Sequence, residues 1–409
     1  MENNVYVGSR GCPYQCAFCV EGNLKQKHRM RSPEKIYFDL RSLLQNTKSK
    51  LIIFGDDTFT ASKTRVFEMC KIINQLRKEF DFVWFAEGRV NVLAKNPELI
   101  RTMAQAGMLV LQVGIESGSQ QVLDAQNKRI TVEEIKTTFA EIGKLKDLDI
   151  RITGNLILGG TAETAETLQE SLEFIKELYK LSDFNAQINY SYLVPFKGTP
   201  IGDNPDKYDV TVLNDNFEMD MHQFAEIICH SKSVTHKQLS AYYSKYQTEL
   251  FHFFQRNIFY FEKQKIDNRI LSDRKLQRKY AIPNDMAPWT RTIYSYQTFS
   301  SYYDLFDKKF IIKDTQNVNL DMYPIRVWEI DYDFQNNYYL FDNLKNEEII
   351  IDGNDIFLWE IADGQHTIRE ILQDKNSPFK NNLSQQIIEL ALNFYKKMYE
   401  NFALVFSEI

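Results

Sequence analysis

An alternation of short apolar runs with amphipathic helical segments, repeated through the first half of the chain, restricts the fold more than any other feature. The runs are rich in valine, isoleucine and aromatic residues, and the later ones end in glycine, aspartate or proline, which is typical of strands. They cover residues 4–9, 50–56, 81–88, 108–116, 150–160 and 187–196. Strand–helix units in series predict a parallel sheet with right-handed crossovers. We therefore expect an α/β fold with a partial (β/α)6 barrel of the TIM type.

Start signals support two of the helices between these strands. Ser32 and Pro33 begin one helical segment, and Thr131 with Glu134 forms the capping-box pattern that begins another. In barrels of this kind the chemistry lies at the carboxyl ends of the strands. A cysteine-rich segment, residues 12–19, follows the first strand, and glycine and acidic clusters follow the later ones. We therefore expect these groups to meet at one end of the sheet.

Composition excludes several classes of protein. The net charge of −6 over 409 residues does not favour a nucleic-acid-binding surface. No run of about 18 apolar residues predicts a membrane span, and the first residues do not show the pattern of a secretory signal. Five cysteines, three of them clustered, argue against a disulfide framework. They favour the reducing cytoplasm, where the cluster would serve a metal.

The clustered cysteines are Cys12, Cys16 and Cys19, in the segment "GCPYQCAFCV". Structural zinc normally takes four ligands, and the nearest imidazole, His28, belongs to a basic stretch rather than to a ligand pair. A [4Fe–4S] cluster held by only three thiolates would leave one iron open to an outside ligand. An open iron indicates chemistry at the metal rather than electron transfer alone. The alternative is that the three cysteines are core residues that cluster by chance.

This spacing, with the aromatic Phe18 directly before the last cysteine, resembles the signature of the radical S-adenosylmethionine (SAM) superfamily. The resemblance implies a [4Fe–4S] cluster on Cys12, Cys16 and Cys19, whose free iron is chelated by the amino and carboxylate groups of SAM. It implies reductive cleavage of SAM to methionine and a 5′-deoxyadenosyl radical, which abstracts hydrogen from a substrate. It also implies an electron donor such as a flavodoxin or ferredoxin.

Later segments resemble the same superfamily in the correct order, over roughly residues 4–200, and within it the cobalamin-associated and methylthiotransferase-like branch. "FGDDTF" (54–59) matches a segment that faces the methionyl amino group, and "VGIESGSQ" (113–120) matches a ribose-contacting segment. "GNLILGGTAET" (154–164) matches an adenine-contacting segment, and "LVPFKGTP" (193–200) matches the segment after the last strand. Through this resemblance the expected SAM-binding residues are Gly55, Asp56, Asp57, Arg89, Glu116, Gly154, Ile157, Gly159 and Pro195.

Each match carries an expected role. Asp56 or Asp57, or a backbone carbonyl at the strand end, would bind the ammonium group, and Glu116 would accept hydrogen bonds from the ribose hydroxyls. The glycines of the adenine-contacting segment would let the backbone approach the base. Arg89 would bind a carboxylate with both arms of its guanidinium, or would instead pair with Glu87.

One departure from the branch bears on the reaction. Many relatives carry a cobalamin-binding domain before the barrel, whereas this sequence begins about three residues before its first strand. We therefore expect that domain to be absent, which puts cobalamin-dependent methyl transfer in doubt.

The sequence changes character after the barrel, which we place at residues 1–203. Residues 204–325 predict a helical and irregular extension that covers the barrel, and residues 326–409 predict a smaller unit. In that unit a hairpin is expected over 337–351, followed by three helices and a final apolar run. This winged-helix-like order resembles PqqD-like domains, which bind the leader peptides of ribosomally made, post-translationally modified peptides.

The resemblance implies a peptide partner for residues 326–409. An extended leader peptide would add as a strand to the edge of the hairpin, with grooves formed by residues such as Trp359 and Phe394. Two alternatives stay open: a structural cap or dimerisation unit, and a reader of nucleic acid. The acidic hairpin and the net charge count against the nucleic-acid reader.

Some residues outside these motifs are also candidates. Cys70 lies on an apolar helical pattern and is expected to be a core thiol. Cys229 could return a hydrogen atom to a substrate radical, as an epimerase requires, or it could be a buried helix cysteine. Tyr14, Tyr190 and Tyr192 could line a substrate cavity, although tyrosine is abundant in this chain.

The sequence therefore predicts a cytoplasmic radical SAM enzyme that matures a ribosomally made peptide through hydrogen abstraction, followed by epimerisation, cross-linking or another rearrangement. The alternative is a radical SAM enzyme that modifies a small molecule or tRNA, with a structural C-terminal unit. A third hypothesis is a redox or scaffold protein that binds a cluster without turnover. The later motifs count against it, because an electron carrier has no need of Glu116 or of residues 193–200.

Overall fold

The computed structural model describes most of the chain, in two compact units. Their ranges are Met1–Tyr246 with Leu271–Pro288, and Gln247–Ile270 with Trp289–Ile409. The described residues are 4–24, 27–214, 226–258, 272, 276, 279–280, 310–311, 318–326, 331–332, 338–342, 347–351, 353–380, 383–400 and 404–407. The predicted domain boundaries after residues 203 and 325 stay predictions.

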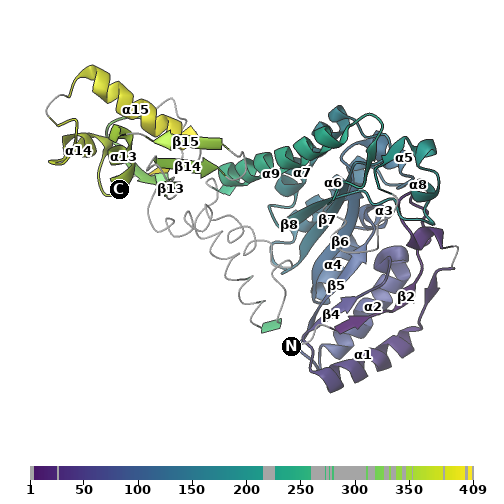
Figure 1. Ribbon diagram of the computed structural model, residues 1–409. Helices are drawn as coiled ribbons and strands as arrows, with labels where there is room; N and C mark the ends of the chain where they lie inside the picture. The colour runs from purple at the N-terminus through teal and green to yellow at the C-terminus, as the bar shows by residue number, and fades with distance from the viewer. Residues whose placement is uncertain are drawn as a thin grey trace. The chain divides into compact units, whose positions relative to one another are not determined.

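A six-stranded parallel sheet forms the centre of the first unit (Figure 1). The strand order is β1-β4-β5-β6-β7-β8, and each neighbouring pair is parallel. The strands are β1 (Asn4–Tyr6), β4 (Leu51–Phe54), β5 (Val83–Gly88), β6 (Met108–Glu116), β7 (Arg151–Leu158) and β8 (Ala186–Tyr192). Strands β1 and β8 are the two edges of this sheet, so the barrel is open. The predicted α/β fold with a partial barrel is confirmed.

Helices join the strands and pack against one another in chain order. They are α1 (Pro33–Thr47), α2 (Lys63–Leu76), α3 (Val90–Lys95), α4 (Glu98–Gln105), α5 (Gln120–Ala125), α6 (Val132–Lys144) and α7 (Ala165–Leu181). Contacts run from α1 to α2, from α2 to α4, from α3 to α6 and from α6 to α7. The Ser32 hydroxyl caps α1, and Thr131 and Glu134 cap α6 reciprocally, so both predicted start signals are confirmed.

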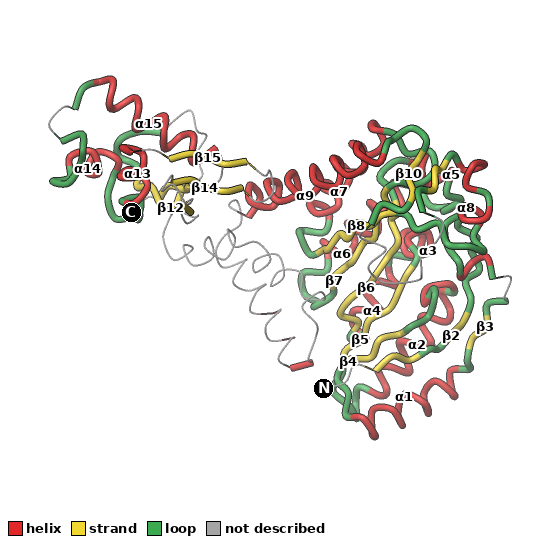
Figure 2. Tube along the Cα trace, viewed as in Figure 1, coloured by secondary structure: helices red, strands yellow, loops and turns green. Residues whose placement is uncertain are grey.

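Short elements complete the first unit. They are β2 (Ser9–Arg10), η1 (Glu21–Asn23), β3 (Arg29–Met30), η2 (Phe59–Ala61), α8 (Pro200–Asp203), η3 (Pro205–Tyr208), β9 (Val210–Val212) and β10 (Cys229–Ser231). Helix α9 (His236–Ile258) follows. The alternative that Cys229 is a helix cysteine is therefore wrong, because this residue begins strand β10 (Figure 2). Antiparallel pairing with β9 provides backbone partners for that strand.

Aromatic residues pack between the sheet and its helices. Trp84 on β5 is fully buried, and its ring centroid lies 5.5 Å from that of Phe54 and 5.2 Å from that of Phe59. The indole Nε1 donates to the carbonyl of Ala106 at 3.0 Å. Such a cluster anchors β4 and β5 side by side, because aromatic side chains bury large areas in preferred edge and tilted contacts.

The opposite face of the sheet is apolar near the amino ends of its strands. There Leu51, Val83 and Val110 pack with Leu276 and Tyr280, which come from a distant part of the chain. The Tyr280 hydroxyl donates to the Asp81 carboxylate at 2.9 Å. This packing fills the lower part of the barrel, which leaves the carboxyl ends of the strands for a cavity.

The described residues of the second unit form two small antiparallel sheets and three helices, besides the end of α9. Its sheets have the orders β13-β14-β15 and β11-β16-β12. The strands are β11 (Phe310–Ile311), β12 (Tyr323–Arg326), β13 (Asp331–Tyr332), β14 (Tyr338–Asp342), β15 (Glu347–Ile351) and β16 (Leu404–Ser407). The helices are α13 (Gly353–Glu360), α14 (Ile368–Gln373) and α15 (Gln385–Glu400). Strands β14 and β15 pair as the predicted hairpin, whose turn residues 343–346 lie outside the described part of the chain.

The order of elements in this unit is as predicted, but the predicted grooves are wrong. Trp359 is 1% exposed and Phe394 is 6% exposed, and both belong to one apolar core with residues of α14 and β16. Their side chains are therefore not available to line a peptide groove. The likeness to a winged-helix domain stays a prediction.

Within the described residues, we find no helix with both the length and the apolar character needed to cross a bilayer.

Replacing Trp84 tests the packing between sheet and helices. We expect Trp84→Phe to lower the free energy of unfolding by about 2 kcal/mol, because the Ala106 carbonyl loses its buried partner. The exposed Phe38 on α1 is the control, and Phe38→Ala should change the free energy of unfolding by less than about 0.5 kcal/mol. Urea unfolding measures both. Equal losses for the two variants would contradict this assignment of the core.

Candidate active site

A cavity of about 340 Å³ opens where the carboxyl ends of β4 to β8 meet the loop after β2. The predicted site residues that line it are Cys12, Cys16, Cys19, Asp57, Arg89, Glu116 and Ile157. Tyr14 lines it as well, as the sequence suggested. The fold thus brings together residues that are far apart in the chain, at the end of the sheet where parallel barrels place their chemistry.

The cysteine loop is held by hydrogen bonds to its backbone. Asn23 donates from Nδ2 to the carbonyl of Cys16 at 2.9 Å and to that of Cys19 at 2.7 Å. The amide of Ala17 donates to the carbonyl of Gln126 at 2.8 Å. Cys16 is buried, whereas Cys12 and Cys19 are half-buried. The loop therefore has a defined shape with all three thiols on one cavity wall.

The donor set fits an iron–sulfur cluster better than a single ion. Over the part of the chain that the structure describes, no three cysteine, histidine or acidic side chains converge closely enough for one metal ion. A cluster of four irons is larger than one ion, so its thiolate ligands stand further apart. Burial, with smaller contributions from Cys16 and Cys12, raises the pKa of Cys19, and a bound metal would reverse such a shift by favouring the thiolate.

Arg89 lies against the cysteine loop. Its guanidinium carbon sits 3.6 Å from the centroid of the Tyr14 ring, and Nη1 lies 3.7 Å from the sulfur of Cys16. Nη2 donates to the carbonyl of Lys128. Arg89 is buried, with 7% of its surface exposed, and its Nε has no hydrogen-bond partner among the described residues. The alternative pairing of Arg89 with Glu87 is not among its contacts.

Glu116 is held in an unusual conformation at the end of β6. Its φ of 55° lies in the left-handed region, at a bulge in the pairing with β7. Such a conformation costs a side chain about 1–3 kcal/mol, so it is retained where the surroundings demand it. Its carboxylate pairs with the buried Lys128. A Cβ on Gly114 would collide with that carboxylate and with the Lys128 ammonium group, so a larger residue there would displace the pair.

Negative charge exceeds positive charge on the cavity wall. Asp57, Glu87 and Glu116 line it, opposite Arg89 and Lys128. Desolvation raises the pKa of Glu87, and the negative charges of Asp57 and Glu116 raise it further. A cationic ligand would relieve this repulsion.

A polar row crosses the inner face of the sheet below these charges. The strand register places Glu87, Gln112, Thr153 and Gln187 side by side on β5, β6, β7 and β8. Gln112 donates to Glu87 at 2.9 Å. Most of the row therefore offers neutral hydrogen-bonding groups.

A second, shorter row lies one step toward the cavity. Asn155 and Asn189 pair across β7 and β8, and the Asn189 amide donates to the Asn155 side-chain oxygen at 3.2 Å. Asn155 lines the cavity. These amides connect the cavity wall to the polar row beneath it through Gln187, which donates to Asn189 at 2.7 Å.

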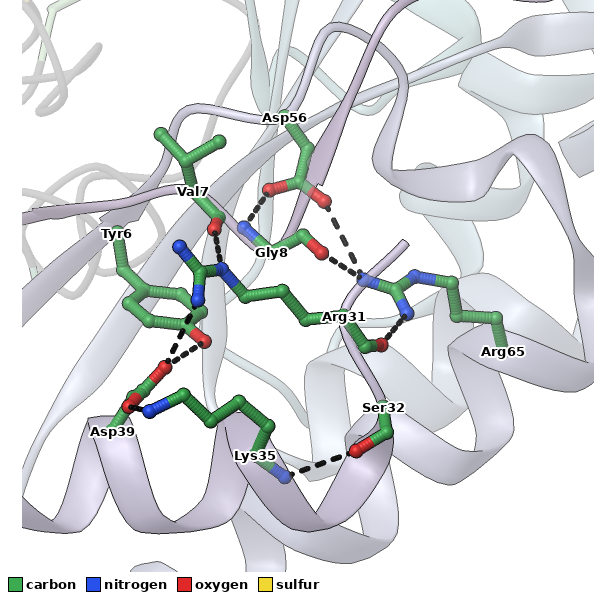
Figure 3. A network of polar contacts seen from close by, with 9 residues as sticks. All are labelled: Tyr6, Val7, Gly8, Arg31, Ser32, Lys35, Asp39, Asp56 and Arg65. Atoms are coloured by element: carbon green, nitrogen blue, oxygen red, sulfur yellow. Dashed lines mark hydrogen bonds and ion pairs between the residues drawn. The ribbon is translucent and has the colours of Figure 1, made fainter. Parts of the chain in front are cut away.

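Other predicted residues lie outside the cavity lining. They are Gly55, Asp56, Gly154, Gly159, Pro195 and Cys229. Asp56 accepts a hydrogen bond from the Gly8 amide (Figure 3) and another from the Ser9 hydroxyl, so its carboxylate is already engaged. Gly154 is closely packed, because a Cβ there would come within 3.1 Å of Ile188, Phe139 and Ile115.

Cys229 stands behind the cavity wall rather than on it. It is fully buried and donates from its sulfur to the carbonyl of Leu193 at 3.3 Å. It packs in one apolar cluster with Ala17, Phe18 and Ile157. Burial, and then the charge of Glu163, raises its pKa to about 12. Cys70 is buried on α2, as predicted for a core thiol, and burial raises its pKa to about 12.

Several residues of the site escaped sequence reasoning. Lys128 sits in a turn whose neighbours Asn127 and Arg129 both have positive φ, and no pattern indicates that its side chain points inward. Asn23 acts on carbonyls of the cysteine loop, which a motif of side-chain identities does not record. Gln112 could have been suspected, as a polar residue inside an apolar strand run.

Comparisons with known proteins agree with this geometry. Residues 6–175 match the family model of the radical SAM superfamily. The chain is 28% identical over 169 residues to an anaerobic magnesium-protoporphyrin IX monomethyl ester cyclase of Rubrivivax gelatinosus, covering 41% of this chain and 30% of that protein. It is 31% identical over 196 residues to an uncharacterized methyltransferase of Pyrococcus horikoshii, covering 48% and 40%.

Two further likenesses complete the comparison. A tRNA-2-methylthio-N(6)-dimethylallyladenosine synthase of Buchnera aphidicola is 26% identical over 207 residues, covering 48% of this chain and 44% of that protein. The chain thus spans less than half the length of these relatives. The solved radical SAM methyltransferase TsrM of Kitasatospora setae, with cobalamin and a [4Fe–4S] cluster bound, superposes with a TM-score of 0.48 at 16% identity, covering 59% of this chain and 52% of that one.

The first part of the chain is therefore a radical SAM domain. The cofactors of this domain are a [4Fe–4S] cluster and SAM. The three cysteines of the loop and the excess of acidic groups in the cavity suit these two cofactors.

The buried Glu163 gives a pH-dependence that the structure predicts. Burial, opposed by hydrogen bonds from the Gly159 and Gly160 amides, raises its pKa from 4.5 to about 8. Between these values the folded protein keeps a proton that the unfolded chain has released. The free energy of unfolding should therefore fall as pH rises through that window, by about 1.4 kcal/mol per pH unit from this group alone.

Glu163→Gln isolates this contribution. Urea unfolding from pH 5 to 8 should show a shallower decline for this variant than for the wild type. Glu166→Gln, at an exposed position on α7, should keep the wild-type slope. A wild-type slope in Glu163→Gln would mean that Glu163 is ionised in the folded protein throughout.

Proposed function

We propose that this chain is a radical SAM enzyme that abstracts hydrogen from a small polar molecule. The observation that carries the proposal is the meeting of Cys12, Cys16 and Cys19 with an acid-rich cavity at the carboxyl ends of the strands. When bound, the cluster and SAM together supply a 5′-deoxyadenosyl radical. The electron comes from a reductant such as a flavodoxin or ferredoxin, in a reducing cytoplasm that preserves free thiols.

The chain's own residues divide the work of holding SAM. Asp57 lines the cavity beside the cysteine loop and suits the ammonium group. Arg89, with its unpartnered Nε, suits the carboxylate. Glu116 suits the ribose hydroxyls, and its ion pair with Lys128 fixes the position of its carboxylate. Ile157 supplies an apolar wall for the adenine.

The charge balance of the cavity supports SAM as the ligand. SAM carries a positive sulfonium and a positive ammonium group, and these would lie among Asp57, Glu87 and Glu116. Burial raises the pKa of Glu87, and the charges of Asp57 and Glu116 raise it further, so a nearby cation would favour its ionised form. Opposite charges at short range in a partly desolvated site attract strongly.

The polar rows support a small polar substrate. Gln112 and Asn155 line the cavity with amide groups, which donate and accept hydrogen bonds without carrying charge. They hydrogen-bond to Glu87 and Asn189, and a polar substrate could add to these hydrogen bonds, whereas an apolar one could not. The relatives named above include enzymes described as acting on small molecules and on tRNA. The net charge of −6 favours a small molecule over tRNA.

A second candidate substrate is a residue of a ribosomally made precursor peptide, modified by epimerisation, cross-linking or another rearrangement. The observation that favours it is the three-stranded sheet of β13, β14 and β15, whose edge strands could accept an extended leader peptide within residues 326–409. The amide rows would suit a peptide group as well as a small molecule. Trp359 and Phe394 do not contribute to that recognition, since both are in the core.

Loss of single cysteines tests the cluster assignment. After anaerobic reconstitution, we expect the wild type to form 5′-deoxyadenosine from SAM and reductant. Cys12→Ala, Cys16→Ala and Cys19→Ala should each lower the rate by at least about a hundredfold, because the cluster loses a ligand. Cys70→Ala, at a buried thiol on α2, is the matched control and should retain activity. No 5′-deoxyadenosine from the wild type would refute the proposed function.

A deuterium-transfer experiment separates the two substrate classes. The reconstituted full-length protein is incubated with a small-molecule extract or with a peptide fraction, both from a fully deuterated bacterial culture. The proposal predicts deuterium in 5′-deoxyadenosine from the small-molecule extract, and Gln112→Leu should remove it. Deuterium from the peptide fraction alone would transfer support to the precursor-peptide candidate.

A further inference from the structure

Asp56 and Arg65 form a buried contact that the proposed function does not use. Neither side chain lines the cavity, yet Asp56 is 1% exposed and Arg65 is 7% exposed. Burying two charges is expensive, and a well-packed apolar pair would often be as stable. A buried charged pair of this kind therefore calls for a role in fixing the positions of the groups around it.

Asp56 grips the chain immediately before the cysteine loop. Its Oδ1 accepts from the Gly8 amide at 2.7 Å, and its Oδ2 accepts from the Ser9 hydroxyl at 2.5 Å. The Arg65 Nη2 lies 3.8 Å from the same carboxylate. Figure 3 shows Asp56 and Arg65 on either side of Gly8. A Cβ at Gly8 would come within 3.4 Å of both side chains, which explains a glycine at this point.

Arg65, on helix α2, holds the same segment, and the contacts of Asp56 and Arg65 together form the grip. Its Nη2 donates to the carbonyl of Gly8 at 2.8 Å, and its Nη1 donates to the carbonyl of Arg31 at 3.0 Å. The Arg31 amide donates to the same Gly8 carbonyl at 2.9 Å. One guanidinium thus ties the start of the cysteine loop to the segment that leads into α1 (Figure 3).

The two residues after Asp56, Asp57 and Thr58, contact the cysteine loop at Gly11 and Cys12. Asp57 accepts from the Gly11 amide at 2.7 Å, and the Thr58 hydroxyl lies 3.4 Å from the sulfur of Cys12. Consecutive residues after β4 therefore contact successive points of the chain up to Cys12. Gly11 has a φ of 82°, so the backbone turns sharply between the contact at Gly11 and the contact at Cys12.

We propose that Asp56 and Arg65 are positioning residues that set where Cys12 enters the cluster site. The segment after β1 has short backbone pairing, between the two-residue strands β2 and β3 and from the Arg31 amide to Gly8, so side-chain contacts contribute much of what holds it. Displacement of Gly8 and Ser9 would carry through Gly11 to Cys12. The proposal rests on the proposed function, because it takes Cys12 to be a cluster ligand.

Two variants weaken the grip in different ways. Asp56→Asn keeps an acceptor for the Gly8 amide but removes the charge opposite Arg65. Arg65→Lys keeps the charge but has no planar fork with which to reach the carbonyls of Gly8 and Arg31 together. The control is Asp39→Asn at the outer edge of the same network, where Asp39 binds Lys35, Tyr6 and the exposed Arg31 side chain rather than residues 8–12.

The first measurement needs no cofactor. Hydrogen–deuterium exchange of the full-length protein before reconstitution should show faster exchange in peptides that contain residues 8–12 for Asp56→Asn and Arg65→Lys, and wild-type exchange there for Asp39→Asn. Unchanged exchange in both test variants, or equal acceleration in all three, would overturn the proposal.

The second measurement follows the cluster. After reconstitution, a chelator should remove iron about tenfold faster from Asp56→Asn and Arg65→Lys than from the wild type or Asp39→Asn, which corresponds to about 1.4 kcal/mol. The electron paramagnetic resonance spectrum of the reduced cluster should change in the same two variants. Faster exchange with unchanged iron loss and spectrum would refute a role at Cys12. A wild type that binds no iron would refute the proposed function, and exchange would still decide whether the grip exists.

Discussion

The charge balance of one cavity is the constraint on which the rest of the site depends. Three thiols, three carboxylates, Arg89 and Lys128 are brought to one end of the sheet. The carboxylates repel one another: burial raises the pKa of Glu87, and the charges of Asp57 and Glu116 raise it further. Iron ions at the thiolates and a cationic ligand at the carboxylates would balance these negative charges. The charges of the cavity therefore suit the two cofactors.

The barrel is built so that this end of the sheet stays open while the other is filled. Trp84 and its aromatic neighbours fix the sheet to its helices, and Leu276 with Tyr280 closes the lower part of the inner face. Between the apolar packing and the cavity, a row of polar side chains crosses four strands, with amides on β6, β7 and β8. Under the proposed function, these uncharged groups would select a substrate by hydrogen-bond geometry, and the charged groups would bind SAM.

The sequence predicted the fold well because its signals are local. Strand runs, the Ser32 cap and the Thr131–Glu134 capping box depend on neighbouring residues, and each occurs where it was expected. The cysteine spacing was equally local, and its three thiols do share one wall. Cys229 was misplaced on a helix because a three-residue strand depends on its partner β9 rather than on its own sequence.

The rest of the site depends on contacts between distant segments. Asp56 and Asp57 are neighbours in one motif, yet one faces Gly8 and the other faces the cavity, which no spacing rule distinguishes. Lys128 meets Glu116 only because the chain turns between them, and Trp359 lies in a core that the three helices of the second unit create together.

Mössbauer spectroscopy of the reconstituted protein tests the central claim most directly. Three protein thiolates on a [4Fe–4S] cluster leave one iron chemically different from the other three. We expect the signal of one iron in four to change when SAM is added, and the other three to stay as they were. Four equivalent irons that do not respond to SAM would contradict the assignment of this cavity.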